Sequence, residues 1–136
     1  MRFDDAAQRF LATKEIAILA TLQRDGSPLA MPMWFLHDAD KITMISVDGL
    51  QKVKNLRRDP RVCVVVETAD KGGNRGVIVQ GEVKFLDDSP ERRALATRFL
   101  DKYAPRLAKL WSGTSMPPNR VMFEIAPTKL RTWGLT

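Results

Sequence analysis

Two segments of this 136-residue chain are apolar on both faces of a strand, and this limits the folds that the chain can adopt. Residues 16–22 and the valine-rich stretch 61–68 carry apolar side chains at successive positions, which point to opposite faces of a sheet. A single open sheet would leave one of those faces in water. A small antiparallel barrel with a contact between subunits would bury both faces, so we expect that architecture and a homodimer.

Apolar periodicity and turn residues place further elements around these two strands. The patterns predict more strands at 29–36, 41–47, 75–86, 121–126 and 129–133. They predict helices at 4–12 and 50–57, and a longer one that begins at Ser89-Pro90 and is kinked or restarted at Pro105. Gly72-Gly73 indicates a flexible loop over 69–74. The expected fold is therefore one domain over 1–136, mainly β with flanking helices.

Pro32 lies inside the predicted strand 29–36. Proline donates no ladder hydrogen bond, so it belongs at the edge of a sheet or at a break in a strand. Backbone groups beside such a residue are free to bond a ligand. Gly81, in the middle of strand 75–86, similarly indicates a bulge or a close approach of another backbone segment.

The short helix 50–57 carries Lys52 and Lys54 near its N-terminus. A helix N-terminus with lysines favours an anion such as phosphate. Lysines are also most often simply solvated, so an exposed helix face is the plain alternative. Asp48 and Gln51 have the spacing of a capping box, and a capping carboxylate would occupy the amides that a phosphate needs.

Arg57, Arg58 and Arg61 form the densest basic cluster of a chain whose net charge is +6. Such a charge favours anionic partners. One interpretation is surface charge paired with Asp59 and Glu67, and the other is a groove for an anionic tail.

Several kinds of chemistry find no support in the sequence. His37 is the only histidine and Cys63 the only cysteine, so neither a metal site nor a Ser-His-Asp or Cys-His hydrolase is expected. A lone cysteine forms no internal disulfide. No apolar run approaches a membrane span and no signal peptide is recognisable, so we expect a cytoplasmic protein without a membrane partner.

Five short motifs, in order along the chain, carry a family resemblance. They are Ala20-Thr21-Leu22 with Asp25-Gly26-Ser27-Pro28, then Pro32-Met33-Trp34-Phe35, then Lys52-Val53-Lys54-Asn55-Leu56, then Asp59-Pro60-Arg61-Val62, and Val77-Ile78-Val79-Gln80-Gly81. Together they resemble the split β-barrel flavoproteins, that is, the pyridoxamine 5'-phosphate oxidase-like family and its flavin- or deazaflavin-dependent oxidoreductase branch. The resemblance implies an antiparallel FMN-binding split barrel and a homodimer with the cofactor in a groove at the subunit interface.

The resemblance also implies roles for individual residues. Pro32, Met33, Trp34 and Phe35 would line the isoalloxazine, and Gln80 would lie near the ring. Ser46, Lys52, Lys54 and Asn55 would hold the phosphate, and Trp133 would stack over the cofactor or close the barrel. Arg57 and Arg58, with Arg61, would meet the oligoglutamate tail of coenzyme F-420. The segment 127–133 lacks the arginine-rich ending of true pyridoxamine phosphate oxidases, which argues against that substrate.

The function expected from these features is hydride transfer between FMN or coenzyme F-420 and a small organic substrate. Few acid–base side chains are needed for this reaction, because the cofactor carries the chemistry. One alternative is a non-catalytic protein on the same barrel that binds a cofactor or a tetrapyrrole. A barrel that binds single-stranded nucleic acid is disfavoured, because the aromatic residues follow apolar stripes and do not alternate with basic ones.

Overall fold

The computed structural model describes residues 1–136 and contains one seven-stranded antiparallel sheet. Its strands along the chain are β1 (Ile16–Leu22), β2 (Pro28–Trp34), β3 (Leu36–Asp38), β4 (Lys41–Val47), β5 (Arg61–Asp70), β6 (Gly73–Phe85) and β7 (Arg120–Trp133). In space they follow the order β2-β1-β5-β6-β7-β4-β3. The predicted fold class, mainly β with an antiparallel split barrel, is confirmed.

The topology requires the sheet to curl. β2 and β3 are its two edge strands, yet Phe35 alone separates them in the sequence. The two edges must therefore come together at this residue. β2 contacts β4 but forms no hydrogen-bonded ladder with it, so the curled sheet stays split along this line.

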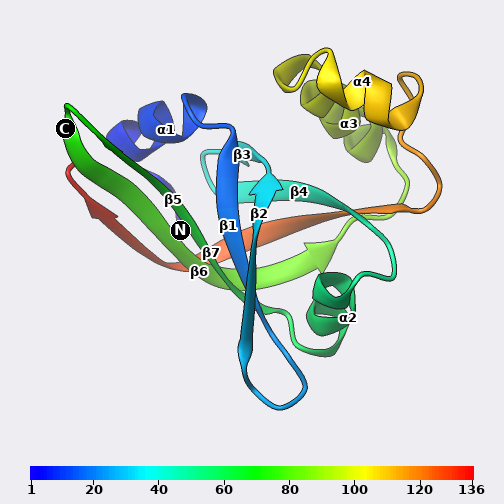
Figure 1. Cartoon of the computed structure of the whole chain (residues 1–136), viewed down its shortest axis with the longest axis horizontal. Helices are drawn as coiled ribbons and strands as arrows, with labels where there is room; N and C mark the ends of the chain where they lie inside the picture. The colour runs from blue at the N-terminus through cyan, green and yellow to red at the C-terminus, as the bar shows by residue number, and fades with distance from the viewer.

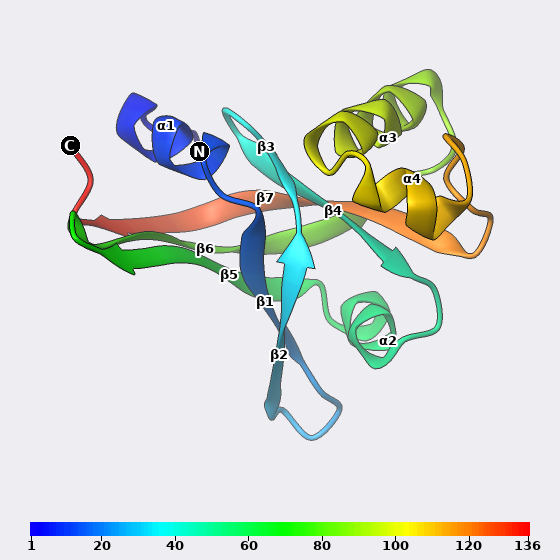
Figure 2. The ribbon, with the colours of Figure 1, turned by 45° about the horizontal axis from the view of Figure 1, so that its top comes forward.

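Four helices surround the sheet: α1 (Asp5–Ala12), α2 (Gln51–Arg58), α3 (Pro90–Lys102) and α4 (Arg106–Trp111). Asp4 caps α1 and Ser89 caps α3, and Pro105 separates α3 from α4, as the sequence predicts. α3 and α4 lie together at one end of the molecule, whereas the C-terminus and the turn between β5 and β6 lie at the other (Figures 1 and 2). No helix has the length and apolar character needed to cross a membrane.

The buried side chains form two clusters. The larger one fills the curl of the sheet with residues such as Leu19, Phe35 and Phe123. The smaller one joins α3 and α4 to the sheet, with Phe99 and Tyr103 at its centre. The helical pair is therefore packed on the barrel through a core of its own.

The strands run further than the sequence patterns predict. The expected loop 69–74 is instead a hairpin, because β5 continues to Asp70 and β6 begins at Gly73. The two strands expected at the C-terminus are one continuous β7, with a change of register opposite Gln80 and Gly81. This irregularity accommodates Pro127, which has no amide to donate.

Two expectations about single residues are confirmed. Pro32 lies on an edge strand, although β2 continues through it to Trp34. Gly81 lies at a close backbone approach, because a Cβ there would collide with the carbonyl oxygen of Ala126.

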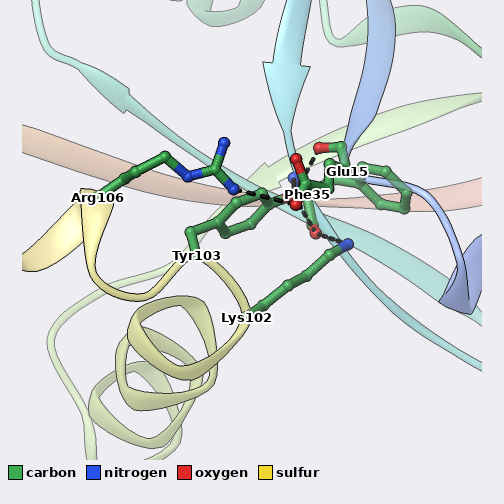
Figure 3. A network of polar contacts seen from close by, with 5 residues as sticks. All are labelled: Glu15, Phe35, Lys102, Tyr103 and Arg106. Carbon is green, nitrogen blue, oxygen red and sulfur yellow. Dashed lines mark hydrogen bonds and ion pairs between the residues drawn. The ribbon is translucent and has the colours of Figure 1, made fainter.

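The hydroxyl of Tyr103 fastens the helical pair to the junction of the two sheet edges (Figure 3). It accepts a hydrogen bond of 2.8 Å from the amide of Phe35 and donates one of 2.7 Å to the carbonyl of Glu15. Its ring stacks on Trp34, with 4.3 Å between centroids and 4° between planes. Burial raises the pKa of Tyr103 to about 12, so the hydroxyl keeps its proton at neutral pH.

Lys102 and Arg106 complete this contact on either side of Tyr103 (Figure 3). Lys102 donates to the carbonyl of Phe35 at 2.7 Å, and its ammonium lies 3.9 Å from the centre of the Phe35 ring. Arg106 pairs with Glu15 at 3.0 Å and lies over Trp34. Neither edge strand bonds the amide or the carbonyl of Phe35. Side chains of the helical pair bond both groups instead, so neither is buried without a partner.

Replacing Tyr103 with phenylalanine keeps the stacked ring but removes the hydroxyl. The buried amide of Phe35 then lacks an acceptor, so we expect the free energy of unfolding to fall by about 1–3 kcal/mol. Urea unfolding followed by circular dichroism measures this change. Arg106→Gln is the matched control, since it breaks a neighbouring but exposed ion pair and should cost less than about 1 kcal/mol. Equal losses in the two variants would contradict the role of the hydroxyl.

The stability of the chain should also depend on pH through Lys102. Burial lowers the pKa of Lys102 to about 8 in the folded chain, from its ordinary value of 10.5. Between these two values the unfolded chain holds a proton that the folded chain lacks, so the contribution of Lys102 to stability increases with pH across this window. That contribution is complete above pH 10.5 and is lost as the pH falls through about 8. Comparing urea unfolding of wild type and Lys102→Met from pH 7 to 10.5 isolates it; a constant difference would refute the assignment.

Candidate functional site

A cavity of about 410 Å³ lies between the sheet edge, α2 and the helical pair. Strands β2 and β4, helices α2, α3 and α4, and the first residue of β7 all contribute to its wall. Nine of its thirteen lining residues are hydrophobic, and none is a carboxylate. Five of the residues singled out in the sequence meet here: Pro32, Met33, Trp34, Ser46 and Lys52.

Lys52 is the half-buried cation of this cavity. Its ammonium makes none of the ion pairs of the chain and has only the sulfur of Met33, at 3.3 Å, as an acceptor. Burial lowers the pKa of Lys52, because a partly desolvated charge is unfavourable. An anion bound in the cavity would restore the missing partner.

The N-terminus of α2 differs from the prediction in a way that favours an anion. Asp48 does not cap the helix; its carboxylate accepts a hydrogen bond from the amide of Gly49 at 2.8 Å and pairs with Arg57 at 3.6 Å. Because the chain turns at Gly49, which has a positive φ, the N-cap of α2 is Leu50. The side chain of Leu50 has no hydrogen-bond acceptor. The first amides of α2 are therefore not occupied by a carboxylate.

Arg120 adds a second positive charge to the same wall. It is the first residue of β7 and pairs with Val47 across the sheet. Its guanidinium donates to the side-chain oxygen of Asn119 at 2.6 Å but contacts no carboxylate. Ser46, Lys52 and Arg120 give this side of the cavity one hydroxyl and two cations.

The rest of the wall is apolar and comes mainly from the helical pair. Phe99, Leu107, Leu110 and Trp111 line it opposite Trp34 of the edge strand. Trp111 follows Leu107 by four residues in the sequence. Its spacing from Leu107 predicts one apolar helix face, but only the three-dimensional fold shows that this face meets β2.

Phe35, which is predicted to line the isoalloxazine, and Asn55, which is predicted to hold the phosphate, are both fully buried. Phe35 is fully buried beneath Tyr103, so only neighbouring residues reach the cavity. Asn55 is also fully buried; its amide nitrogen donates to Thr21 at 3.0 Å, and its oxygen accepts from Gln51 at 2.8 Å. The side chain of Asn55 thus ties α2 to β1 and leaves no surface for a phosphate.

The other basic residues of α2, and Arg61 at the start of β5, lie outside the cavity. Arg57 lies 4.4 Å from the centre of the Phe85 ring, and Arg58 donates to the carbonyl of Leu22. Arg61 pairs with Asp59 at 2.8 Å, and its hydrogen bonds hold the pKa of Asp59 at about 2. The side chain of Lys54 is exposed and makes no hydrogen bond or ion pair. The pairing with Asp59 agrees with the surface-charge interpretation, whereas Glu67 forms no such pair.

Gln80 and Trp133 lie away from the cavity within one chain. Gln80 borders a separate depression on the outer face of the sheet, beside Thr21 and Cys63. Trp133 is near the C-terminal end of β7, where its indole nitrogen donates to Asn74 at 2.9 Å and its ring covers Gly76. Within one chain, Trp133 therefore packs against the neighbouring strand β6.

The chemistry available in the cavity is recognition of a flat, anionic molecule. Cations and a hydroxyl lie on one side, aromatic faces lie on the other, and an edge strand offers backbone groups that pair with nothing in the sheet. The cavity contains no carboxylate, histidine or cysteine that could act as a general acid or base.

Solved structures of known proteins share this fold. A candidate pyridoxamine 5'-phosphate oxidase from Listeria innocua is 25% identical, with a TM-score of 0.76 over 96% of this chain and 97% of that one. An F-420 reductase is 24% identical, with a TM-score of 0.66 over 95% and 98% of the two chains. HutZ, a heme storage protein from Vibrio cholerae, is 15% identical, with a TM-score of 0.77 over 96% and 94%. The last two likenesses concern the fold alone.

The sequence itself matches the family model described as pyridoxamine 5'-phosphate oxidase, over residues 3–134. That match spans nearly the whole chain, including every strand that builds the cavity. The chain therefore belongs to the pyridoxamine 5'-phosphate oxidase family of split β-barrel proteins.

Proposed function

We propose that this protein is an oxidoreductase that binds FMN or coenzyme F-420 in the cavity and transfers hydride to or from a small organic substrate. The observation that carries the proposal is Lys52, a half-buried cation without an anionic partner, in one cavity with the edge strand and Trp34. A phosphate beside Lys52 and a flat ring beside Pro32 to Trp34 would satisfy both sides of that cavity.

The residues present fit such a cofactor. Lys52, Arg120, Ser46 and the uncapped amides of α2 would hold the phosphate. β2 pairs with β1 on one side only, so part of its backbone can bond the polar edge of a ring. When bound, a flavin or deazaflavin supplies the hydride-carrying ring. Bound there, the reduced cofactor would supply the hydride for reduction of a substrate, and water would supply the proton.

Both cofactors remain within this proposal. The F-420 reductase among the structural neighbours supports the deazaflavin, and the exposed guanidiniums of Arg57 and Arg61 would be accessible to an oligoglutamate tail. FMN needs only the phosphate contacts, which the cavity itself provides. Titration of the purified chain with each cofactor distinguishes them.

We further propose a homodimer formed through the outer face of β1, β5 and β6. Ile18 lies opposite Val65, which lies opposite Ile78, so these side chains share one face of the sheet. Ile16 and Ile18 are 44% and 39% exposed in one chain. An interface between subunits would bury these apolar side chains. Gln80 borders this same face. In the proposed dimer, Gln80 of one subunit would therefore contact the cofactor ring bound by the other subunit.

A second candidate function is storage or transport of a tetrapyrrole, favoured by the likeness to the heme storage protein HutZ. An apolar cavity with two cations also suits a flat macrocycle with carboxylates. The absorption spectrum of the co-purified ligand separates the two functions, because heme and flavin absorb at different wavelengths.

Replacing Lys52 with alanine should weaken FMN binding by about 1.5–3 kcal/mol, which is about 10- to 150-fold in Kd. Riboflavin, which has the same ring but no phosphate, should bind wild type and variant alike. Fluorescence titration measures both affinities. Lys54→Ala is the matched control, since it removes an exposed lysine from the same helix. An unchanged FMN affinity in Lys52→Ala would exclude Lys52 from the site.

Light scattering at micromolar concentration should give the mass of a dimer for the wild-type chain. Ile18→Arg places a charge in the middle of the proposed interface and should shift the mass toward the monomer. Thr97→Asp, an exposed change on α3, should leave the dimer intact. A wild-type monomer that still binds cofactor would refute an interface site.

A further inference from the structure

The rim of the cavity carries two large apolar side chains that the protein leaves uncovered. Leu110 on α4 is 66% exposed, and Leu50 at the start of α2 is 45% exposed. Both line the cavity, although they come from elements on different sides of it. Of the five large hydrophobic residues exposed on the chain, these two border the cavity, whereas Ile16 and Ile18 lie on the outer face of β1.

The deeper wall differs from the rim in burial. Phe99 and Trp111 are 2% and 7% exposed and belong to the core of the helical pair. A cavity of about 410 Å³ is of the size that one drug-sized ligand fills. With a cofactor inside it, any second ligand would lie at the rim, against Leu50 and Leu110.

The charges around the cavity restrict what such a ligand can be. Lys52 and Arg120 line it, Arg106 lies 5.1 Å from the Trp34 ring, and no carboxylate lines the wall. Among the side chains around the cavity, a cationic ligand would therefore find no carboxylate to pair with. A strongly polar one would lose hydration against two leucines without gaining hydrogen bonds.

We propose that Leu50 and Leu110 form the substrate subsite, which selects a flat, apolar molecule. This inference rests on the proposed function, because it places the substrate beside a cofactor held in the cavity. The two leucines would cover opposite edges of the substrate, while its face lies toward the cofactor ring. They act as specificity-determining residues and take no part in holding the phosphate.

The test compares wild type with Leu50→Ala, Leu110→Asp and the double variant, each loaded with FMN; alanine at position 50 adds no capping carboxylate to α2. Lys109→Asp is the matched control, since it places a carboxylate on α4 one residue away. Equilibrium dialysis measures binding of 1-naphthol, an uncharged two-ring probe, and of 1-naphthylmethylamine, its cationic counterpart. Fluorescence titration measures the Kd for FMN, and light scattering gives the oligomeric state.

We expect wild type and Lys109→Asp to bind 1-naphthol and to bind the amine more weakly. Each leucine variant should lose about fivefold or more in 1-naphthol affinity, as burial of part of a leucine side chain predicts. FMN affinity should stay within about twofold of wild type in all variants, because the phosphate contacts are intact.

Three outcomes would overturn the inference. Equal binding of 1-naphthol by the leucine variants and wild type would show that the rim contacts no substrate. A change from dimer to monomer in Leu50→Ala or Leu110→Asp would show that the rim is a subunit contact. Failure of wild type to bind FMN or coenzyme F-420 would refute the proposed function and this inference with it, whereas the first two outcomes leave that function standing.

Discussion

The peptide unit of Phe35 is the point on which the rest of the structure depends. It joins two strands that are the opposite edges of one sheet, so it must lie where the sheet curls back on itself. Neither ladder can bond its amide and carbonyl there, and a buried unbonded peptide costs free energy. Tyr103 and Lys102 bond both groups from the helical pair. The same contacts bring α4 against the edge strand, so the link that closes the barrel also builds the wall of the cavity.

Lys52 combines partial burial with the absence of an ion pair. Arg61, Arg75, Arg93, Arg98 and Arg106 each have a carboxylate within 3.2 Å, as expected for surface charges that pair where they can. Lys52 has none and is partly desolvated, which disfavours its charged form. A ligand that brings an anion to Lys52 removes this penalty and stabilises the folded chain as it binds. Binding and folding are therefore coupled at this residue.

The sequence predicts local features well and enclosure poorly. Asp4, Ser89 and Pro105 act where expected, because capping and proline geometry depend on adjacent residues alone. Pro32 on an edge follows from its missing donor. Asn55 misleads, because its position on a basic helix gives no sign that Thr21 and Gln51 enclose it. Asp48 misleads because Gly49 allows a turn that moves the cap to Leu50. The wall from α4 is absent from the prediction, since it arises from packing between segments about seventy residues apart.

A cavity at the split between two sheet edges explains why its chemistry rests so little on catalytic side chains. An edge strand offers backbone groups whatever its sequence, and a helix N-terminus offers amides in the same way. These parts can hold a flat anionic molecule while the remaining wall is free to vary. The side chains that would distinguish one ligand from another are then those of the remaining wall and rim, which in this chain come from α4 and from the turn before α2.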